Sequence, residues 1–234
     1  CYKGRMVGTL GAVAAFSTMS GKHHATGPQG GVVFTRDEAL CWEAKRFSDR
    51  GKPFNTDATS NLRAGLNLNG NDLSAAIGRV QLGKIGAMNA RRRAVAAQIE
   101  EGIAGLKTVR LGWRAEETEG VYWFMRFHLN AGRLTVDKDG FAAAMAAEGI
   151  PVSASYRHIP SEAIWFKERR VFSGSDYPWG LPAYQGDRNA AFPCPNAVAA
   201  VESHFIMSIH ENWREQEGED VVAALAKVEG VYLR

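Results

Sequence analysis

The sequence predicts an α/β fold in which part of a larger domain is followed by a smaller α+β domain. Two short apolar runs, Val13–Phe16 and Val32–Thr35, have the uninterrupted hydrophobicity of strands in a buried sheet. A helical pattern then extends from Asp72 to about Ala104. Beyond it, strand and helix patterns alternate, as in a compact α+β domain. The chain of 234 residues is long enough for one good hydrophobic core or two modest ones.

Three features precede the long helix. Residues Tyr2–Gly8 have the pattern of a hairpin edge with its turn at Lys3-Gly4-Arg5. A helix is predicted from Asp37 to about Ser48, where apolar residues recur at helical spacing after an acidic start. Residues Asp49–Asn71 contain glycine, proline and several asparagines with little periodicity, so we expect a long irregular loop. Loops of that length in compact domains are commonly functional or disordered.

The long helix connects the two predicted domains. A bend in it is expected at Gly83 or Gly86, since glycine weakens a helix interior. We place the passage between the domains at residues 84–92. This gives a first domain of residues 1–87 and a second of residues 88–234.

The second domain is predicted to contain two strands and two helices. Val121–Leu129 is rich in aromatic residues and is a strong strand candidate, and Phe205–Ile209 is a shorter one. Helices are predicted over Val136–Gly149, with the glycine as the stop signal, and over Gly218–Glu229.

Bulk properties argue against several classes of protein. The net charge is +3, the pI is near 8.8, and the basic residues are spread along the chain. The densest basic cluster, Arg91–Arg93, lies in a helical pattern and is interpreted as a solvated helix face, not as a nucleic-acid site. Cys1, Cys41 and Cys194 are too few and too scattered for a disulfide framework or a metal site, which fits a reducing cytoplasm. No apolar run could span a bilayer and no signal peptide is recognisable, so we expect a cytoplasmic protein with neither membrane nor nucleic-acid partners.

A polar loop of small residues joins the first two apolar runs and carries Lys22 near its middle. No other lysine or arginine and no acidic residue occurs between Arg5 and Arg36. An isolated lysine on a loop between two strands can serve as an amine nucleophile toward a carbonyl. The same position also suits an ordinary lysine at the mouth of a glycine-rich turn. The residues alone leave both interpretations open.

Two motifs resemble those of the DegT/DnrJ/StrS aminotransferases. The first is Phe16-Ser17-x-x-x-x-Lys22, followed by a Gly-Gly pair and an apolar strand that ends in Thr35. The second runs from Gly65 through Gly78 to Gln81-Leu82, where a Gly-x-Asn segment leads into an Ala-Ala-x-Gly-x-x-Gln-Leu helix. The two motifs occur in the family's order, which makes the match specific.

The resemblance implies an aspartate-aminotransferase-like fold, fold type I of the pyridoxal-phosphate enzymes, with pyridoxal 5'-phosphate as the cofactor. Lys22 matches the lysine that holds the cofactor covalently and, once released, moves a proton between substrate and cofactor. Ser17 matches the serine that contacts the cofactor phosphate, although a strand-end serine can also bond its own backbone. Asn67 matches the asparagine that reaches across a homodimer interface to the cofactor phosphate of the partner.

The sequence departs from the family's pattern at several positions. Asn69 stands where an arginine is usual, and Gln29 stands where many relatives are acidic. The acidic group of the substrate is therefore expected to be bound differently. His23 and His24 follow the lysine, where relatives often have asparagine and an apolar residue. A histidine there could tune proton transfer near neutral pH, or it could be an ordinary hydrogen-bonded loop residue.

The candidate substrate-binding residues are His23, Tyr156 and His158. The last two belong to a segment that resembles the mouth of the family's active site. A structural corner of aromatic residues and proline is the other interpretation of that segment.

The resemblance predicts an aminotransferase that moves an amino group from glutamate or glutamine to a keto-sugar, expected to be nucleotide-linked, in polysaccharide or secondary-metabolite biosynthesis. A pyridoxal-phosphate sugar dehydratase or lyase and a non-catalytic sugar-binding fragment are the alternatives. A relative with histidine in place of the lysine acts as a dehydratase, so Lys22 favours transamination. A segment like Cys1–Gly8 lies well inside the family's polypeptides, and we therefore expect this chain to be the carboxy-terminal portion of a longer protein.

Overall fold

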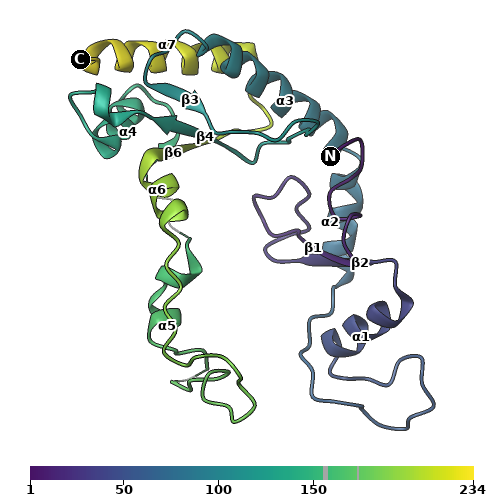
Figure 1. Cartoon of the computed structure of the whole chain (residues 1–234). Helices are drawn as coiled ribbons and strands as arrows, with labels where there is room; N and C mark the ends of the chain where they lie inside the picture. The colour runs from purple at the N-terminus through teal and green to yellow at the C-terminus, as the bar shows by residue number, and fades with distance from the viewer. Residues whose placement is uncertain (155–157, 173) are drawn as a thin grey trace. The chain divides into compact units, whose positions relative to one another are not determined.

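The structure is a computed structural model that describes residues 1–154, 158–172 and 174–234 (Figure 1). The chain divides into two compact units. The first comprises Cys1–Ala96, Trp113–Trp123 and His210–Arg214, and the second comprises Ala97–Gly112, Phe124–Ile209 and Glu215–Arg234. The domain boundary between residues 87 and 88 stays a prediction.

The first unit contains one antiparallel strand pair. Strand β1 (Val13–Ser17) pairs with β2 (Gly31–Thr35), so that Ser17 lies opposite Gly31. Both strands occur where the sequence predicts them. The expectation that they are buried is wrong for this chain, because Val13, Phe16, Val32 and Val33 are 48–57% exposed. Among the described residues no third strand joins the pair, and two strands alone leave most of their apolar side chains uncovered.

Helix α1 (Glu38–Ser48) follows β2 and begins at a capping residue. The side chain of Asp37 accepts a hydrogen bond from the backbone N–H of Leu40 at 3.0 Å, which satisfies one of the free donors of the first turn. The helix therefore starts and ends as the sequence predicts. The irregular loop that follows folds back on the helix end, where Asp49 forms an antiparallel bridge with Asn67.

The predicted long helix is two helices. Helix α2 (Asp72–Leu82) is capped by the side chain of Asn71, and α3 (Ile85–Gly102) starts after a break at Gly83 and Lys84. The prediction of one helix with a bend is therefore wrong: the helix ends before Gly83, one of the two expected positions, while Gly86 lies within α3. Glycine loses more conformational entropy than other residues when its backbone becomes helical, so a helix ends easily there.

The second unit is built on a four-stranded antiparallel sheet in the order β3-β4-β6-β5. Figure 1 labels β3, β4 and β6 of this sheet. Its strands are β3 (Val109–Leu111), β4 (Phe124–Leu129), β5 (Val152–Ser153) and β6 (His204–Ser208). The strand predicted from Val121 begins only at Phe124, because Tyr122 has a φ of +46°, which a strand does not accommodate.

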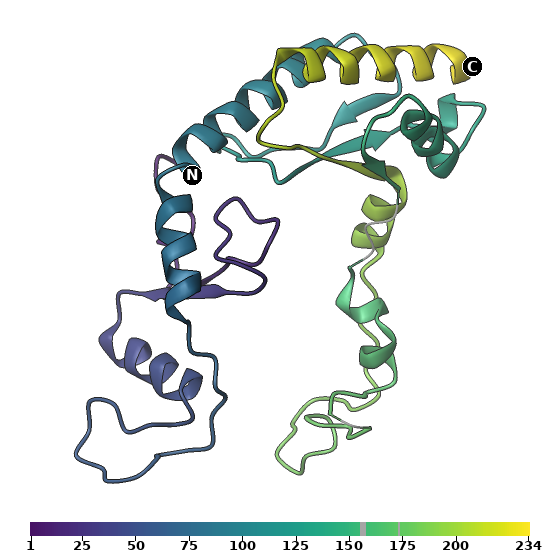
Figure 2. The same ribbon diagram turned by 180° about the vertical axis from the view of Figure 1, so that it is seen from behind.

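Two helices cover this sheet and complete the core. Helix α4 (Lys138–Ala147) brings Phe141 to within 5.7 Å of the ring of Phe205, which in turn stacks on Phe127 at 5.2 Å. Helix α7 (Glu215–Tyr232) runs beside the last turns of α3 (Figure 2). A Cβ at Gly102 of α3 would lie 2.5 Å from the side chain of Val222, so glycine allows the two helices to approach.

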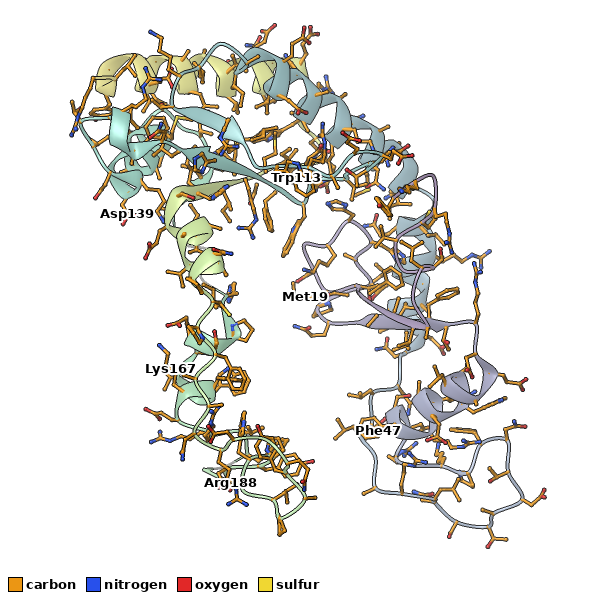
Figure 3. All side chains as sticks on the ribbon, in the orientation of Figure 1. Met19, Phe47, Trp113, Asp139, Lys167 and Arg188 are labelled. Atoms are coloured by element: carbon orange, nitrogen blue, oxygen red, sulfur yellow. The ribbon has the colours of Figure 1, made fainter. Side chains whose placement is uncertain are left out.

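The segment between β5 and β6 holds short elements that the sequence does not predict. They include α5 (Ile164–Lys167) and α6 (Pro195–Ser203), and Figure 3 labels Lys167 and Arg188 on this segment. A short 3-10 turn, Pro160–Glu162, precedes α5, and another, Ala131–Arg133, lies between β4 and α4. None of the helices in the described part of the chain has the length and apolarity needed to cross a membrane.

Candidate active site

The loop of residues 18–30 between β1 and β2, here called the lysine loop, is closed by hydrogen bonds at its base. Met19, labelled in Figure 3, belongs to it. The backbone N–H of Thr18 donates to the carbonyl of Gly30 at 2.9 Å, and the hydroxyls of Thr18 and Thr26 lie 2.8 Å apart. A Cβ at Gly30 would come within 2.5 Å of both hydroxyls. Glycine at this position therefore makes room for the paired threonines.

The lysine loop is also attached to helix α2. The ring nitrogen Nε2 of His24 lies 2.9 Å from the carbonyl oxygen of Gly78. A Cβ at Gly78 would lie 2.8 Å from the methyl group of Thr26, so a larger residue would push the loop away from the helix. These contacts give His24 a structural role and fix the backbone from which Lys22 projects.

The side chain of Lys22 lies against an aromatic ring. Its amine is 3.5 Å from the ring centroid of Trp123, and its backbone N–H donates to the carbonyl of Met19 at 3.1 Å. An ammonium group over an indole face is attracted by the negative potential of the ring. The contact with Trp123 therefore favours this position of the Lys22 amine, and the sequence does not reveal it.

His23 lies beside a polar cluster formed by Asn89 and Arg92 of helix α3 together with Glu211. Its Nε2 atom is buried and has no hydrogen-bond partner among the described residues. Burial and, next, the positive charge of Arg92 lower the pKa of His23, while Glu211 and Asn89 act in the opposite direction with less effect. The ring is therefore neutral at pH 7.

Arg92 is the centre of this cluster. Its guanidinium donates to a carboxylate oxygen of Glu211 at 2.6 Å and to the carbonyl of Tyr122 at 3.2 Å, and only 5% of its side chain is exposed. The interpretation of Arg91–Arg93 as a solvated helix face is therefore wrong for Arg92. The helical spacing indicates that Arg92 is buried, because it places Arg92 on the same face as Met88 and the buried residues of the next turn.

The neutral state of His23 leads to a pH-dependent stability. Because the folded-state pKa of His23 is lowered, the unfolded chain takes up the proton first as the pH falls below about 6.5. The stability that the neutral ring contributes is present above that pH and is lost as the pH falls through the folded pKa.

We expect the free energy of unfolding of the His23→Gln variant to vary less between pH 7 and pH 5 than that of the wild type. Urea unfolding at several pH values measures this, and His210→Gln, at an exposed position, is the control; equal slopes for wild type and His23→Gln would contradict it.

Ser17 and Asn67 both present polar groups to solvent. Ser17 is the exposed last residue of β1, and its hydroxyl oxygen accepts a long hydrogen bond of 3.5 Å from the backbone of Met19. The hydroxyl proton therefore remains available to an acceptor. Asn67 lies in the loop after α1, where its side-chain oxygen accepts a hydrogen bond from Asn69 at 2.9 Å. Within the described ranges no hydrogen bond links Lys22, Ser17 and Asn67 to one another.

Of the two remaining substrate-binding candidates, the structure describes only His158. Tyr156 lies outside the described residues. His158 is exposed in the second unit and lines a pocket of about 600 Å³ together with Trp165, Glu162 and Val198. Its assignment to substrate binding stays a prediction.

The groups present in the first unit fit pyridoxal phosphate in their chemistry. Lys22 supplies a primary amine that can condense with an aldehyde, on a loop whose backbone is fixed. Ser17 has a hydroxyl with an uncommitted proton, and the amide of Asn67 has a free donor end, both suited to phosphate oxygens. These three residues would hold the cofactor.

Comparison with known proteins places the chain in a family. Residues 1–226 match the model of the DegT/DnrJ/EryC1/StrS aminotransferase family. A curated relative, dTDP-3-amino-3,4,6-trideoxy-alpha-D-glucose transaminase of Streptomyces venezuelae, is 31% identical over 155 residues, which cover 66% of this chain and 38% of the relative.

Solved structures show the same fold. DesV of S. venezuelae matches with a TM-score of 0.76 at 23% identity, over 97% of this chain and 54% of its own. The sugar aminotransferase CalS13 of Micromonospora echinospora matches with a TM-score of 0.77 at 20% identity, over 97% of this chain and 55% of its own. The chain thus spans about half the length of these structures and has the fold of part of a type I pyridoxal-phosphate enzyme. It belongs to the DegT/DnrJ/EryC1/StrS aminotransferase family.

Proposed function

We propose that this chain provides the reactive lysine of a pyridoxal-phosphate aminotransferase that transfers an amino group from glutamate or glutamine to a nucleotide-linked keto-sugar. The observation that carries the proposal is the presentation of Lys22. Its loop is closed at the base by Thr18 and Thr26 and attached to α2 through His24, and its amine rests on Trp123. A primary amine in a fixed position is what covalent attachment of a carbonyl cofactor requires.

Each of the three cofactor-binding residues has a distinct part. Lys22 would hold the cofactor covalently, and its amine would also carry a proton during amino transfer. Ser17 donates its hydroxyl proton to the cofactor phosphate, and Asn67 donates from its amide to the phosphate bound by a second copy of the chain. The cofactor supplies the electron sink that makes the substrate proton labile. The proposal includes a cytoplasmic homodimer.

Named relatives support this activity and also the second candidate. The S. venezuelae relative is named as a sugar transaminase. A structural neighbour, the Escherichia coli GDP-4-keto-6-deoxy-D-mannose-3-dehydratase, was solved with bound hydrated pyridoxal phosphate and matches with a TM-score of 0.72 at 17% identity, over 96% of this chain and 57% of its own. A dehydratase therefore remains the second candidate, and the retained Lys22 favours transamination.

The half-reaction with the amino donor tests the proposal. The full polypeptide, loaded with pyridoxal phosphate and given L-glutamate without an acceptor, is expected to release 2-oxoglutarate in an amount equal to the enzyme and then stop. L-Glutamine is tested in the same way, and D-glutamate is the control that should give no keto acid. A folded, cofactor-loaded protein that releases no keto acid from either donor would overturn the aminotransferase proposal. Loss of water from a keto-sugar by that protein would then establish the dehydratase.

A further inference from the structure

The loop that carries Asn67 is bound to the end of helix α1 by its backbone. The N–H of Arg50 donates to the carbonyl of Leu66 at 2.8 Å, and the N–H of Leu68 donates to the carbonyl of Ser48 at 2.8 Å. These bonds form the bridge between Asp49 and Asn67. The main chain therefore holds the side chain of Asp49 close to those of Asn67 and Asn69, although about twenty residues separate Asp49 from the two asparagines along the sequence.

The carboxylate of Asp49 is the fixed point of this arrangement. The residue is only 7% exposed. One carboxylate oxygen, Oδ1, accepts from Nδ2 of Asn69 at 2.8 Å and from Arg50, while the other, Oδ2, accepts from Lys52 at 2.9 Å. The hydrogen bonds from Asn69, Lys52 and Arg50 hold the pKa of Asp49 well below its ordinary value. Asp49 is therefore ionised at neutral pH, and an ionised carboxylate can only accept hydrogen bonds.

Because the carboxylate of Asp49 can only accept, it determines the orientation of the Asn69 amide, and the Asn69 amide in turn determines that of Asn67. Because Asp49 only accepts, Asn69 must turn its NH₂ group toward the carboxylate. That group has two protons, and the second is donated to Asn67, whose side-chain oxygen lies 2.9 Å away. Asn67 must therefore turn its oxygen inward. Its own NH₂ group then points away from Asn69, with two protons to donate and no partner among the described residues.

We propose that Asp49 and Asn69 are positioning residues that fix the amide of Asn67 with its NH₂ group outward, as a donor to the phosphate of pyridoxal phosphate. This inference rests on the proposed function and adds two residues to it. It also accounts for the asparagine at position 69, where the family's pattern has arginine. Both side chains are donors that can serve the same two acceptors, Asp49 and Asn67.

The test compares two substitutions of Asn69 in the full polypeptide. Asn69→Arg retains a donor toward both acceptors and is expected to keep the wild-type affinity for pyridoxal phosphate. Asn69→Asp has almost the same shape; one of its oxygens shares a proton with Asp49, and the other can only accept, so the amide of Asn67 must turn its NH₂ group inward to meet it. We expect Asn69→Asp to weaken pyridoxal phosphate binding about tenfold or more, which is the effect of one hydrogen bond to a charged group. Equilibrium dialysis measures the dissociation constants.

Pyridoxal, which lacks the phosphate, separates a positioning role from a structural one. Asn69→Asp should leave the affinity for pyridoxal unchanged, and in the Asn67→Ala background it should add no further loss of pyridoxal phosphate binding. Asn61→Ala, which removes a 2.8 Å hydrogen bond from another asparagine of the same loop to the carbonyl of Arg50, controls for general loosening. Equal weakening by Asn61→Ala, or equal loss of both ligands, would overturn the inference. A wild-type protein that binds neither ligand would instead refute the proposed function.

Discussion

Replacing Lys22 with alanine in the full polypeptide is expected to abolish amino transfer. Under the proposed function, the variant loses both the amine that would hold the cofactor covalently and the base that would move the proton. General acid–base catalysis alone contributes about 10²- to 10⁴-fold, so the residual rate should fall by at least that factor. The visible absorbance of the cofactor-loaded enzyme, and its change on addition of glutamate, should disappear with the activity.

Lys22→Arg distinguishes the chemistry of the amine from its contact with Trp123. A guanidinium also stacks on an indole face, so this variant can keep the contact that the ammonium makes at 3.5 Å. It cannot form the covalent link. We expect it to match the wild type in thermal stability and to match Lys22→Ala in its lack of activity.

Peptide mapping provides a readout that does not depend on turnover. After borohydride reduction, the wild type should carry the cofactor mass on the peptide that contains Lys22, and neither variant should. Lys84→Ala, at an exposed lysine between α2 and α3, should remain active and labelled at Lys22. Cofactor attached to another lysine in the wild type, or turnover by Lys22→Ala, would contradict the assignment.

Local sequence patterns predicted most of the elements that present the reactive groups. The two apolar runs and the acidic helix start at Asp37 each depend on residues close together in the chain, and the structure has both strands and the helix. The lysine loop was recognisable for the same reason. Short-range signals are sufficient where hydrogen bonds and backbone preferences act between near neighbours.

The partners of these groups could not be predicted, because they come from distant segments. The sequence identifies Trp123 only as an aromatic residue of a predicted strand, about a hundred residues after Lys22, and does not predict its contact with that lysine. Glu211 meets Arg92 across 119 positions, and the basic triplet alone gave no sign of that contact. Asp49 looked like an ordinary residue of an irregular loop. Its effect on Asn69 and Asn67 follows from hydrogen-bond directions that only the folded loop defines.

The second unit contains a buried carboxylate, that of Glu229, which no local sequence pattern distinguishes from its neighbours. Glu229, near the end of α7, is 5% exposed and accepts hydrogen bonds from the backbone N–H groups of Lys107 and Thr108 at 2.8 and 2.7 Å, and from the hydroxyl of Thr108. Burial raises its pKa, but the hydrogen bonds from Thr108 and the backbone outweigh burial, so the net pKa lies below the ordinary value. Glu229 thereby joins α7 to the start of β3.

Glu229→Ala is expected to lower the free energy of unfolding by about 3 kcal/mol, because it leaves several buried donors without an acceptor at about 1–3 kcal/mol each. For a chain of this length that corresponds to a fall in Tm of about 6–12 °C, which calorimetry or denaturant unfolding at pH 7 would detect. Glu219→Ala, at an exposed position of the same helix, should change the free energy by no more than about 0.5 kcal/mol.

Since the folded-state pKa of Glu229 is lowered, its contribution is present above about pH 4.3 and is lost as the pH falls through the folded value. The difference between wild type and Glu229→Ala should therefore shrink in acid, and a difference that is absent at pH 7 or equal to that of Glu219→Ala would show that the carboxylate does not stabilise the second unit.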